Sequence, residues 1–479
     1  MRTPFPSHFT IHNLSNDREP LQLTKLQNVY LKQLLQELCD AYKDGSLDAF
    51  GLYVYGLVLK ESPTGPHSAH SILMESILAF PWNWSAWLDL ASLCIADPNL
   101  HPIVEKYLKS LHSHYMYCFF CAHVLLENQG HENALAVLEK LLQPDSNVLF
   151  QTPYVASKMA VAHYHLREFE VSQECFVSLL EKDPYRLEDM DVYSNILYVQ
   201  EDSVALSQLA HTAVKVDKYR PESCCIVGNY YSLKSQRQKA IQYFQRALKL
   251  NRNYTSAWTL MGHEYVELKN TAAAMEAYRM AVDVNAKDYR AWYGLGQTYE
   301  FLNMQLYALF YYRKAASLRP YDPRMWCAMG SCYLSLGRKA DAIRSYERAV
   351  SHQDLEGIAT QKLASLYRQD GQKEKAAQCY MRHLELRYQA TASNPTDCKL
   401  ETILNGVVVH ASEAEALLYL ASYHRNHGEY ETAALCCGRL LEYPGPEKEE
   451  GKALLREIRS RRERLGPPES PRRKRRDED

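Results

Sequence analysis

The feature that most constrains this chain is a repeat of 34 residues that begins at Pro221. Written in rows of that length, the sequence places residues of one type in one column. A column of small residues holds Gly228, Gly262, Gly296 and Gly330, a second holds Ala240, Ala274, Ala308 and Ala342, and an aromatic column holds Phe244, Tyr278, Tyr312 and Tyr346. Such a period means that each row is one supersecondary unit that buries its apolar face only against its neighbours.

The order of residues within a row is typical of the tetratricopeptide repeat, a hairpin of two antiparallel helices. Three rows carry a tryptophan four residues before the glycine, at Trp258, Trp292 and Trp326. The glycine and alanine columns are expected where the two helices touch, because only a small side chain lets two backbones approach closely. Thirty-five Tyr against 19 Gly also suits helical hairpins better than sheets, whose turns use glycine. The sequence therefore predicts an all-α fold, a superhelical solenoid of helix-turn-helix repeats.

The repeat frame also predicts how the chain is divided. We expect a loose segment over 1–20, a docking or capping helix within 21–48, divergent repeats over 49–148, the regular array over 153–390, an insert over 391–413, a further repeat over 414–447, a C-terminal helix over 448–465 and a disordered basic tail over 466–479.

Motifs for chemistry are weak throughout the sequence. Cys118 and Cys121 have the spacing of zinc ligands, but no second pair lies at a matching distance, so buried thiols are expected. Gly294-Leu295-Gly296 lies inside a predicted helix and follows no strand, which favours packing over a nucleotide site. We therefore predict no catalytic residue, no metal and no cofactor.

Charge and hydropathy limit the partners. The formal net charge is −2, which gives no reason to expect nucleic-acid binding. The best apolar run, Phe50 to Leu59, is far shorter than the roughly 20 residues of a membrane span, so no membrane partner is predicted.

The remaining candidate site is the inner surface of the superhelix, which the first helix of each row is expected to line. The side chains predicted there are Asn229, Thr259, His263, Glu267, Arg290, Tyr293, Gln297 and Glu300. Amides, tyrosines and carboxylates on one wall suit an extended peptide, since an amide can bond its backbone and a carboxylate can pair with arginine. A clamp for a C-terminal carboxylate, as in co-chaperones, is disfavoured because the fifth row position holds Cys225, Thr259, Tyr293 and Cys327 instead of lysine.

Several longer stretches resemble one family, the eighth-subunit repeat scaffold of the anaphase-promoting complex. They include "CCIVGNYYSLKSQRQKAIQYFQRALKLN" (224–251), "AWTLMGHEYVELKNTAAAMEAYR" (257–279) and "RAWYGLGQTYEFLNM" (290–304), together with 48–59, 181–199 and 449–458. The resemblance covers about 20–460 and includes positions outside the repeat consensus.

The resemblance implies a non-enzymatic subunit of a multi-subunit ubiquitin ligase that degrades cell-cycle regulators. Its implied partners are the platform, repeat and small accessory subunits, and the C-box motif of a co-activator, which the inner surface would bind. The family's positions correspond to Asn229 and Glu264, with Glu267, Tyr293 and Glu300 as neighbours from the argument above. A generic repeat adaptor in another assembly remains the alternative.

The two ends of the sequence depart from the family. The N-terminal repeats that the family uses for dimerisation are not evident, so homodimerisation is left open. The tail carries five consecutive cations, at 472–476, which suit either an import receptor or a solubilising role. The family's role in cell division implies that the chain occurs in nucleus and cytoplasm.

Overall fold

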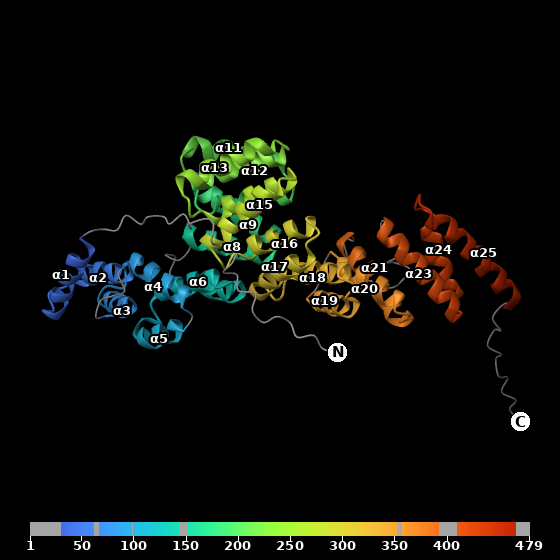
Figure 1. Ribbon diagram of the computed structural model, residues 1–479, viewed down its shortest axis with the longest axis horizontal. Helices are drawn as coiled ribbons and strands as arrows, with labels where there is room; N and C mark the ends of the chain where they lie inside the picture. Colours follow the sequence, from blue (N-terminus) through green and yellow to red (C-terminus); the bar gives the residue numbers. More distant parts are fainter. Residues whose placement is uncertain are drawn as a thin grey trace, which may run out of the picture. The chain divides into compact units, whose positions relative to one another are not determined.

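The computed structural model describes residues 30–61, 67–97, 99–142, 152–352, 354, 356–391 and 410–465. These residues form 24 α-helices and no strand (Figure 1), which confirms the all-α prediction. The predicted loose N-terminus, nearly all of the predicted insert and the basic tail lie outside the described residues.

The chain divides into two compact units, Met1–Ile196 and Leu197–Asp479. The first contains α1 (Leu31–Lys43), α2 (Ala49–Glu61), α3 (Ala69–Ala79), α4 (Trp84–Ala96), α5 (Leu100–Tyr107), the 3-10 turn η2 (Lys109–Leu111), α6 (Tyr115–Glu127), α7 (His131–Leu142), α8 (Pro153–Leu166) and α9 (Phe169–Lys182). The boundary falls within α10 (Met190–Val199).

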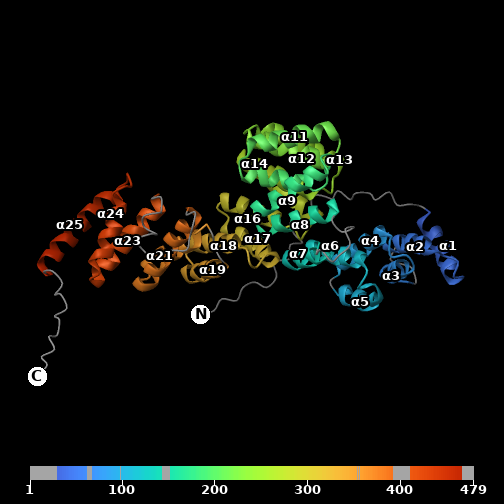
Figure 2. The same cartoon turned by 180° about the vertical axis from the view of Figure 1, so that it is seen from behind.

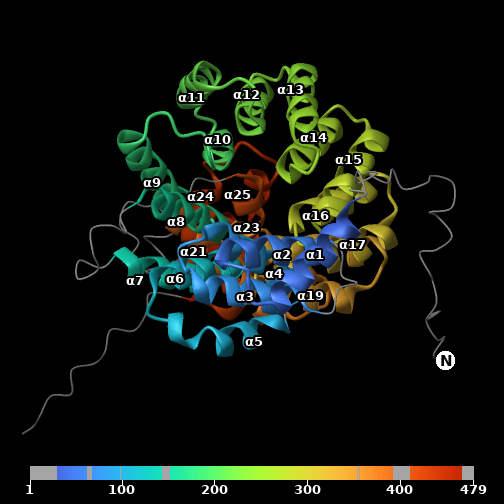
Figure 3. The ribbon, with the colours of Figure 1, turned by 90° about the vertical axis from the view of Figure 1, so that its left-hand side faces the viewer.

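The second unit continues with the regular repeats. Its helices are α11 (Ser203–Val216), α12 (Pro221–Leu233), α13 (Arg237–Leu250), α14 (Thr255–Glu267), α15 (Thr271–Val284), α16 (Tyr289–Phe301), α17 (Gln305–Leu318), α18 (Pro323–Ser335), α19 (Lys339–Ser351), α20 (Ile358–Gln369), α21 (Lys373–Thr391), α23 (Ala411–His427), α24 (Tyr430–Leu440) and α25 (Glu447–Leu465). Figure 3 shows α11 to α17 following one another around an arc, and Figures 1 and 2 show α18 to α25 succeeding one another in chain order.

The repeat frame sets the turns as well as the helices. The residue between the two helices of a row adopts a positive φ at the same row position in five rows, at Ser235, Lys269, Asn303, Gly337 and Gly371. A glycine reaches this left-handed conformation without a steric penalty, whereas the other three residue types do not. Some helix starts carry a side-chain cap, for example Asp288 and Asp322, each of which accepts a hydrogen bond from the backbone two residues later.

The glycine and aromatic columns meet in the core. A Cβ atom added to Gly228, Gly262, Gly296 or Gly330 would lie 2.4–2.7 Å from a ring atom of the aromatic residue 16 positions later in the same row. The Tyr278 ring also lies against Gly294 of the next row, where an added Cβ would be 2.5 Å from it. The aromatic residue therefore joins its own hairpin to the next one, and Gly294 and Gly296 are packing positions, as the sequence predicts.

The first helices of the rows lie on the inner side of the curve. Helix α12 contacts α14, and α14 contacts α16, whereas the second helices α13, α15 and α17 contact one another less. Elements that approach more closely lie at the smaller radius of an arc. Side chains that point away from the hairpin on α12, α14 and α16 therefore face the inner surface.

Candidate functional site: the inner surface of the second unit

A buried carboxylate stands at the centre of the candidate site. Glu264 on α14 is 5% exposed, and one of its oxygens accepts a 2.5 Å hydrogen bond from the Ser232 hydroxyl on α12. Its other oxygen, Oε2, is buried and has no hydrogen-bond donor among the described residues. Burial raises the pKa of Glu264, while the Ser232 hydrogen bond and the charge of Arg237 oppose that shift.

The chain supplies its own arginine to this carboxylate. Arg237, the first residue of α13, lies with Nη1 3.7 Å from Oε2 of Glu264 and with Nη2 3.0 Å from Oε2 of Glu267. The Glu267 side chain is 57% exposed, whereas that of Arg237 is 28% exposed. One guanidinium thus bridges two carboxylates one helical turn apart, and the site binds an arginine in the structure itself.

Asn229 lies on α12 one turn before Ser232 and is 2% exposed. The sequence predicts that its amide bonds the backbone of a peptide, which requires access that the side chain does not have in this structure. Asn229 and Glu264 are therefore buried members of the inner wall, and Glu267 is the exposed carboxylate beside them.

Tyr293 and Glu300 form a second group on α16. The Tyr312 hydroxyl of α17 donates a 2.6 Å hydrogen bond to Glu300, and the Tyr312 ring lies 5.3 Å from the Tyr293 ring. Burial raises the pKa of Tyr293. Both residues are half-buried, so they retain part of their surface toward the inner side.

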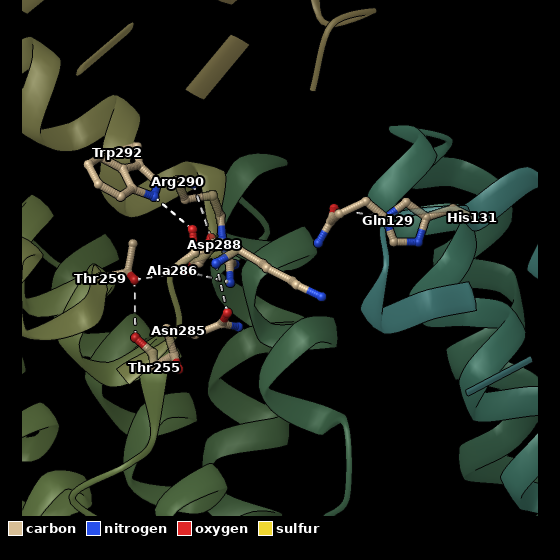
Figure 4. A network of polar contacts seen from close by, with 10 residues as sticks. Gln129, His131, Thr255, Thr259, Asn285, Ala286, Asp288, Arg290 and Trp292 are labelled. Atoms are coloured by element: carbon tan, nitrogen blue, oxygen red, sulfur yellow. Dashed lines mark hydrogen bonds and ion pairs between the residues drawn. The ribbon is translucent and has the colours of Figure 1, made fainter. Parts of the chain in front are cut away.

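A third group joins α14 to the start of α16 (Figure 4). Asp288 accepts hydrogen bonds from Thr259 Oγ1 at 3.3 Å and from Arg290 Nε at 3.0 Å. Because Asp288 is only 6% exposed, these donors hold a buried charge in place. Asp322 and Arg324 repeat the pairing one row later, at 2.7 Å.

The structure thus places predicted residues in three groups, of which the third joins Thr259 and Arg290 through Asp288. Glu264 and Glu267 are joined through Arg237, and Tyr293 and Glu300 are joined through Tyr312. Sequence reasoning missed Arg237 because it belongs to a second helix, whereas the prediction considered only first helices. Its signal was an arginine at a row position that holds Thr271, Gln305, Lys339 and Lys373 in the next four rows.

The cysteines do not form a metal centre in the part of the chain that the structure describes. No group of three or more His, Cys, Asp or Glu side chains there is arranged to hold a metal ion. Burial raises the pKa of Cys121 to about 11 and also raises that of Cys118, which keeps both as thiols near neutral pH, whereas a metal ligand is a thiolate. Within the same described ranges, every helix is too short or too polar to cross a membrane.

Family models match most of the array. The model described as anaphase promoting complex subunit 8 / Cdc23 matches residues 15–175. Tetratricopeptide repeat models match 221–254, 255–288, 289–322 and 323–351, and another matches 359–392. The first four matches begin at the residues that open the predicted rows, so the predicted repeat frame is confirmed.

Curated relatives carry the same family name. Anaphase-promoting complex subunit 8 of Arabidopsis thaliana is 46% identical over 199 residues, which cover 41% of this chain and 32% of the plant protein. The cell division cycle protein 23 homolog of Homo sapiens is 42% identical over 197 residues, covering 41% of this chain and 31% of the human protein. The matched stretch thus spans about a third of the length of these relatives.

A solved structure shares the fold. The crystal structure of the APC/C hetero-tetramer Cut9–Hcn1 superposes with a TM-score of 0.56 at 17% sequence identity, covering 86% of this chain and 76% of that chain. At this identity the likeness concerns the fold alone. The chain is therefore a tetratricopeptide-repeat protein, and the resemblance to subunit 8 of the anaphase-promoting complex that its sequence predicts is confirmed.

Proposed function

We propose that this chain is a non-catalytic scaffold subunit of the anaphase-promoting complex, a multi-subunit ubiquitin ligase, and that its inner surface binds an arginine-containing co-activator motif. The resemblance supports the assembly. The observation that carries the binding role is the arginine site formed by Glu264 and Glu267, which the chain fills with its own Arg237.

The proposed binding step uses two acceptors of this site, the exposed carboxylate of Glu267 and the buried oxygen Oε2 of Glu264. An incoming arginine presents the same planar fork of donors as Arg237 and can pair with the exposed carboxylate of Glu267. Displacement of the half-buried Arg237 side chain would then open Oε2 of Glu264, which lacks a hydrogen-bond donor in the described structure. Pairing that oxygen would satisfy a buried acceptor, which favours the bound state.

The assembly is tested by affinity purification of the full-length chain followed by mass spectrometry. Recovery of cullin-like and RING-type ligase subunits is the expected result. Their absence, with another set of proteins recovered in stoichiometric amounts, would instead support the alternative of an adaptor in another assembly.

The binding site is tested with a fluorescein-labelled C-box peptide and fluorescence anisotropy. Glu267→Gln is preferred to changes at Asn229 or Glu264, because those two side chains are buried and their loss would disturb the fold. An ion pair this exposed is worth up to about 1 kcal/mol, so affinity should fall by up to about fivefold. Glu276→Gln, on an exposed position of α15, is the matched control and should bind as the unmodified protein does. If both variants bind the peptide with the same affinity, Glu267 does not belong to the binding site.

A further inference from the structure

One repeat carries large apolar side chains where its two neighbours carry polar residues or alanine. At the end of α16, along the turn that follows and on the outward side of α17, the structure exposes Phe301 by 66%, Met304 by 42%, Leu306 by 69%, Tyr307 by 49% and Phe310 by 43%. These five residues are called the α17 patch. Because α17 is the second helix of its row, the patch is separate from the inner surface described above.

The other repeats provide an internal comparison for four of these positions. The comparison uses the rows that begin at 221, 255, 323 and 357. The column of Met304 holds Gln236, Asn270, Arg338 and Gln372, and the column of Leu306 holds Gln238, Ala272, Ala340 and Glu374. The column of Tyr307 holds Lys239, Ala273, Asp341 and Lys375, and the column of Phe310 holds Gln242, Glu276, Arg344 and Gln378. None of these sixteen residues is a large apolar one. In the two earlier rows, which begin at 153 and 187, these columns hold one exposed valine each, Val171 and Val204. Only the row that begins at 289 carries large apolar side chains at all four columns, which indicates that another molecule covers them.

The patch rests on a rigid base. The Tyr307 ring stacks 5.6 Å from the Tyr299 ring, which stacks in turn 5.1 Å from the Tyr311 ring. Arg279 of α15 donates a 2.9 Å hydrogen bond to the Tyr299 hydroxyl, and Phe310 lies 5.3 Å from Tyr311. Since these rings are already held in place, a partner loses little side-chain entropy on binding here.

Charge indicates which kind of partner fits. Arg313 and Lys314 follow Phe310 by three and four residues, so they continue its side of the helix. Both are exposed, and neither has an ion-pair partner among the described residues. Helix α17 contains no acidic residue. An apolar surface that ends in two unpaired cations is complementary to an apolar surface that ends in carboxylates.

We propose that the α17 patch is a docking surface for an acidic amphipathic helix of a partner protein. Leu306 and Phe310 are one helical turn apart, a spacing that suits apolar anchors on one side of a second helix. The carboxylates of that helix face Arg313 and Lys314. This proposal is independent of peptide binding at the inner surface.

The test is photo-cross-linking in the full-length chain, expressed in cells, with p-benzoylphenylalanine at position 307. The expected product joins the patch to a segment of another protein that has more Asp and Glu than Lys and Arg and apolar residues at i and i+4. The same cross-linker at position 239, the equivalent column of α13, is the matched control and should give little product. A product with a second copy of this chain, a product with a basic segment, or a yield no higher than at position 239 would each overturn the proposal.

Two variants then separate the apolar and charged contributions. Phe310→Gln introduces the residue that two other rows hold at this column, and should lower the cross-link yield at least about tenfold through the lost apolar burial. Arg313→Glu combined with Lys314→Glu should lower it as well, because like charges would then face each other. Gln242→Ala on α13 should leave the yield unchanged. Wild-type yields from both patch variants, at an unchanged melting temperature, would contradict the docking surface.

Discussion

Replacement of Gly296 by alanine probes the contact between glycine and an aromatic ring that four rows share. The added Cβ atom would lie 2.4 Å and 2.5 Å from two ring carbons of Tyr312. Carbon atoms in favourable contact are about 3.5–4.0 Å apart, so the ring must move by about 1 Å. Tyr312 has no exposed surface, and its hydroxyl is bonded to Glu300 at 2.6 Å, which resists such a movement.

The expected cost is that of overpacking, about 1–3 kcal/mol in the free energy of unfolding. Alanine also gains about 0.5–1 kcal/mol over glycine within a helix, which partly hides this cost. Gly438→Ala is the matched control, because Gly438 is an exposed helical glycine with no atom within 4 Å of the added Cβ. The two variants share the helix gain, so the difference between them isolates the overpacking cost.

The measurement is urea unfolding followed by circular dichroism for both variants and for the parent chain. Gly438→Ala should match or exceed the parent in stability, and Gly296→Ala should fall about 1–3 kcal/mol below Gly438→Ala. In a Tyr312→Leu background, which removes the ring, Gly296→Ala should cost much less. If Gly296→Ala is as harmless as Gly438→Ala, or costs the same without the Tyr312 ring, the proposed contact is wrong.

Three further changes test other parts of the structure by urea unfolding. Ser232→Ala removes the one hydrogen-bond donor to buried Glu264 among the described residues and should lower the free energy of unfolding by about 1–3 kcal/mol, whereas no loss would contradict the burial of that carboxylate. Lys269 adopts a φ of 60°, which is strained for any residue except glycine, so Lys269→Gly should raise the free energy of unfolding by about 0.5–1 kcal/mol. A lower free energy of unfolding would mean that this residue is not in the left-handed conformation. Burial by itself raises the pKa of Glu413, but its hydrogen bonds and Arg387 lower it overall. Its stabilisation is therefore complete above the ordinary value of 4.5 and is lost as the pH falls below it. Glu413→Gln should weaken the loss of stability that accompanies a fall of the pH from 7 to well below 4.5, and an unchanged pH dependence would exclude this carboxyl.

The candidate site could be predicted only in part. The repeat positions placed Glu267, Tyr293 and Glu300 on the inner side, and the family resemblance added Glu264. The contacts between first helices support that side. It could not show that Arg237 bridges the two carboxylates. That pair joins side chains of neighbouring rows, and nothing in the 34-residue period marks which side chains meet across two rows.

The repeat pattern also could not predict which side chains are buried. Asn229 has the residue type and row position expected of a residue that binds a peptide, yet its side chain is buried, with 2% exposed. In the same way, the sequence shows that Leu306 and Phe310 are apolar, but only the structure shows that they are exposed. Exposure depends on the neighbouring helices, whereas a column records only the residue type.

The sequence by itself determined the all-α class, the register of the rows and the columns of small residues where helices meet. These follow from sequence because each row packs against its nearest neighbours in the same way, so the requirement recurs every 34 residues. The tertiary structure decided which carboxylates hold an arginine, which polar side chains are buried and where an apolar patch stays uncovered. Those features differ from row to row, since the repeat fold constrains the side chains between its helices and leaves those on its surfaces free to vary.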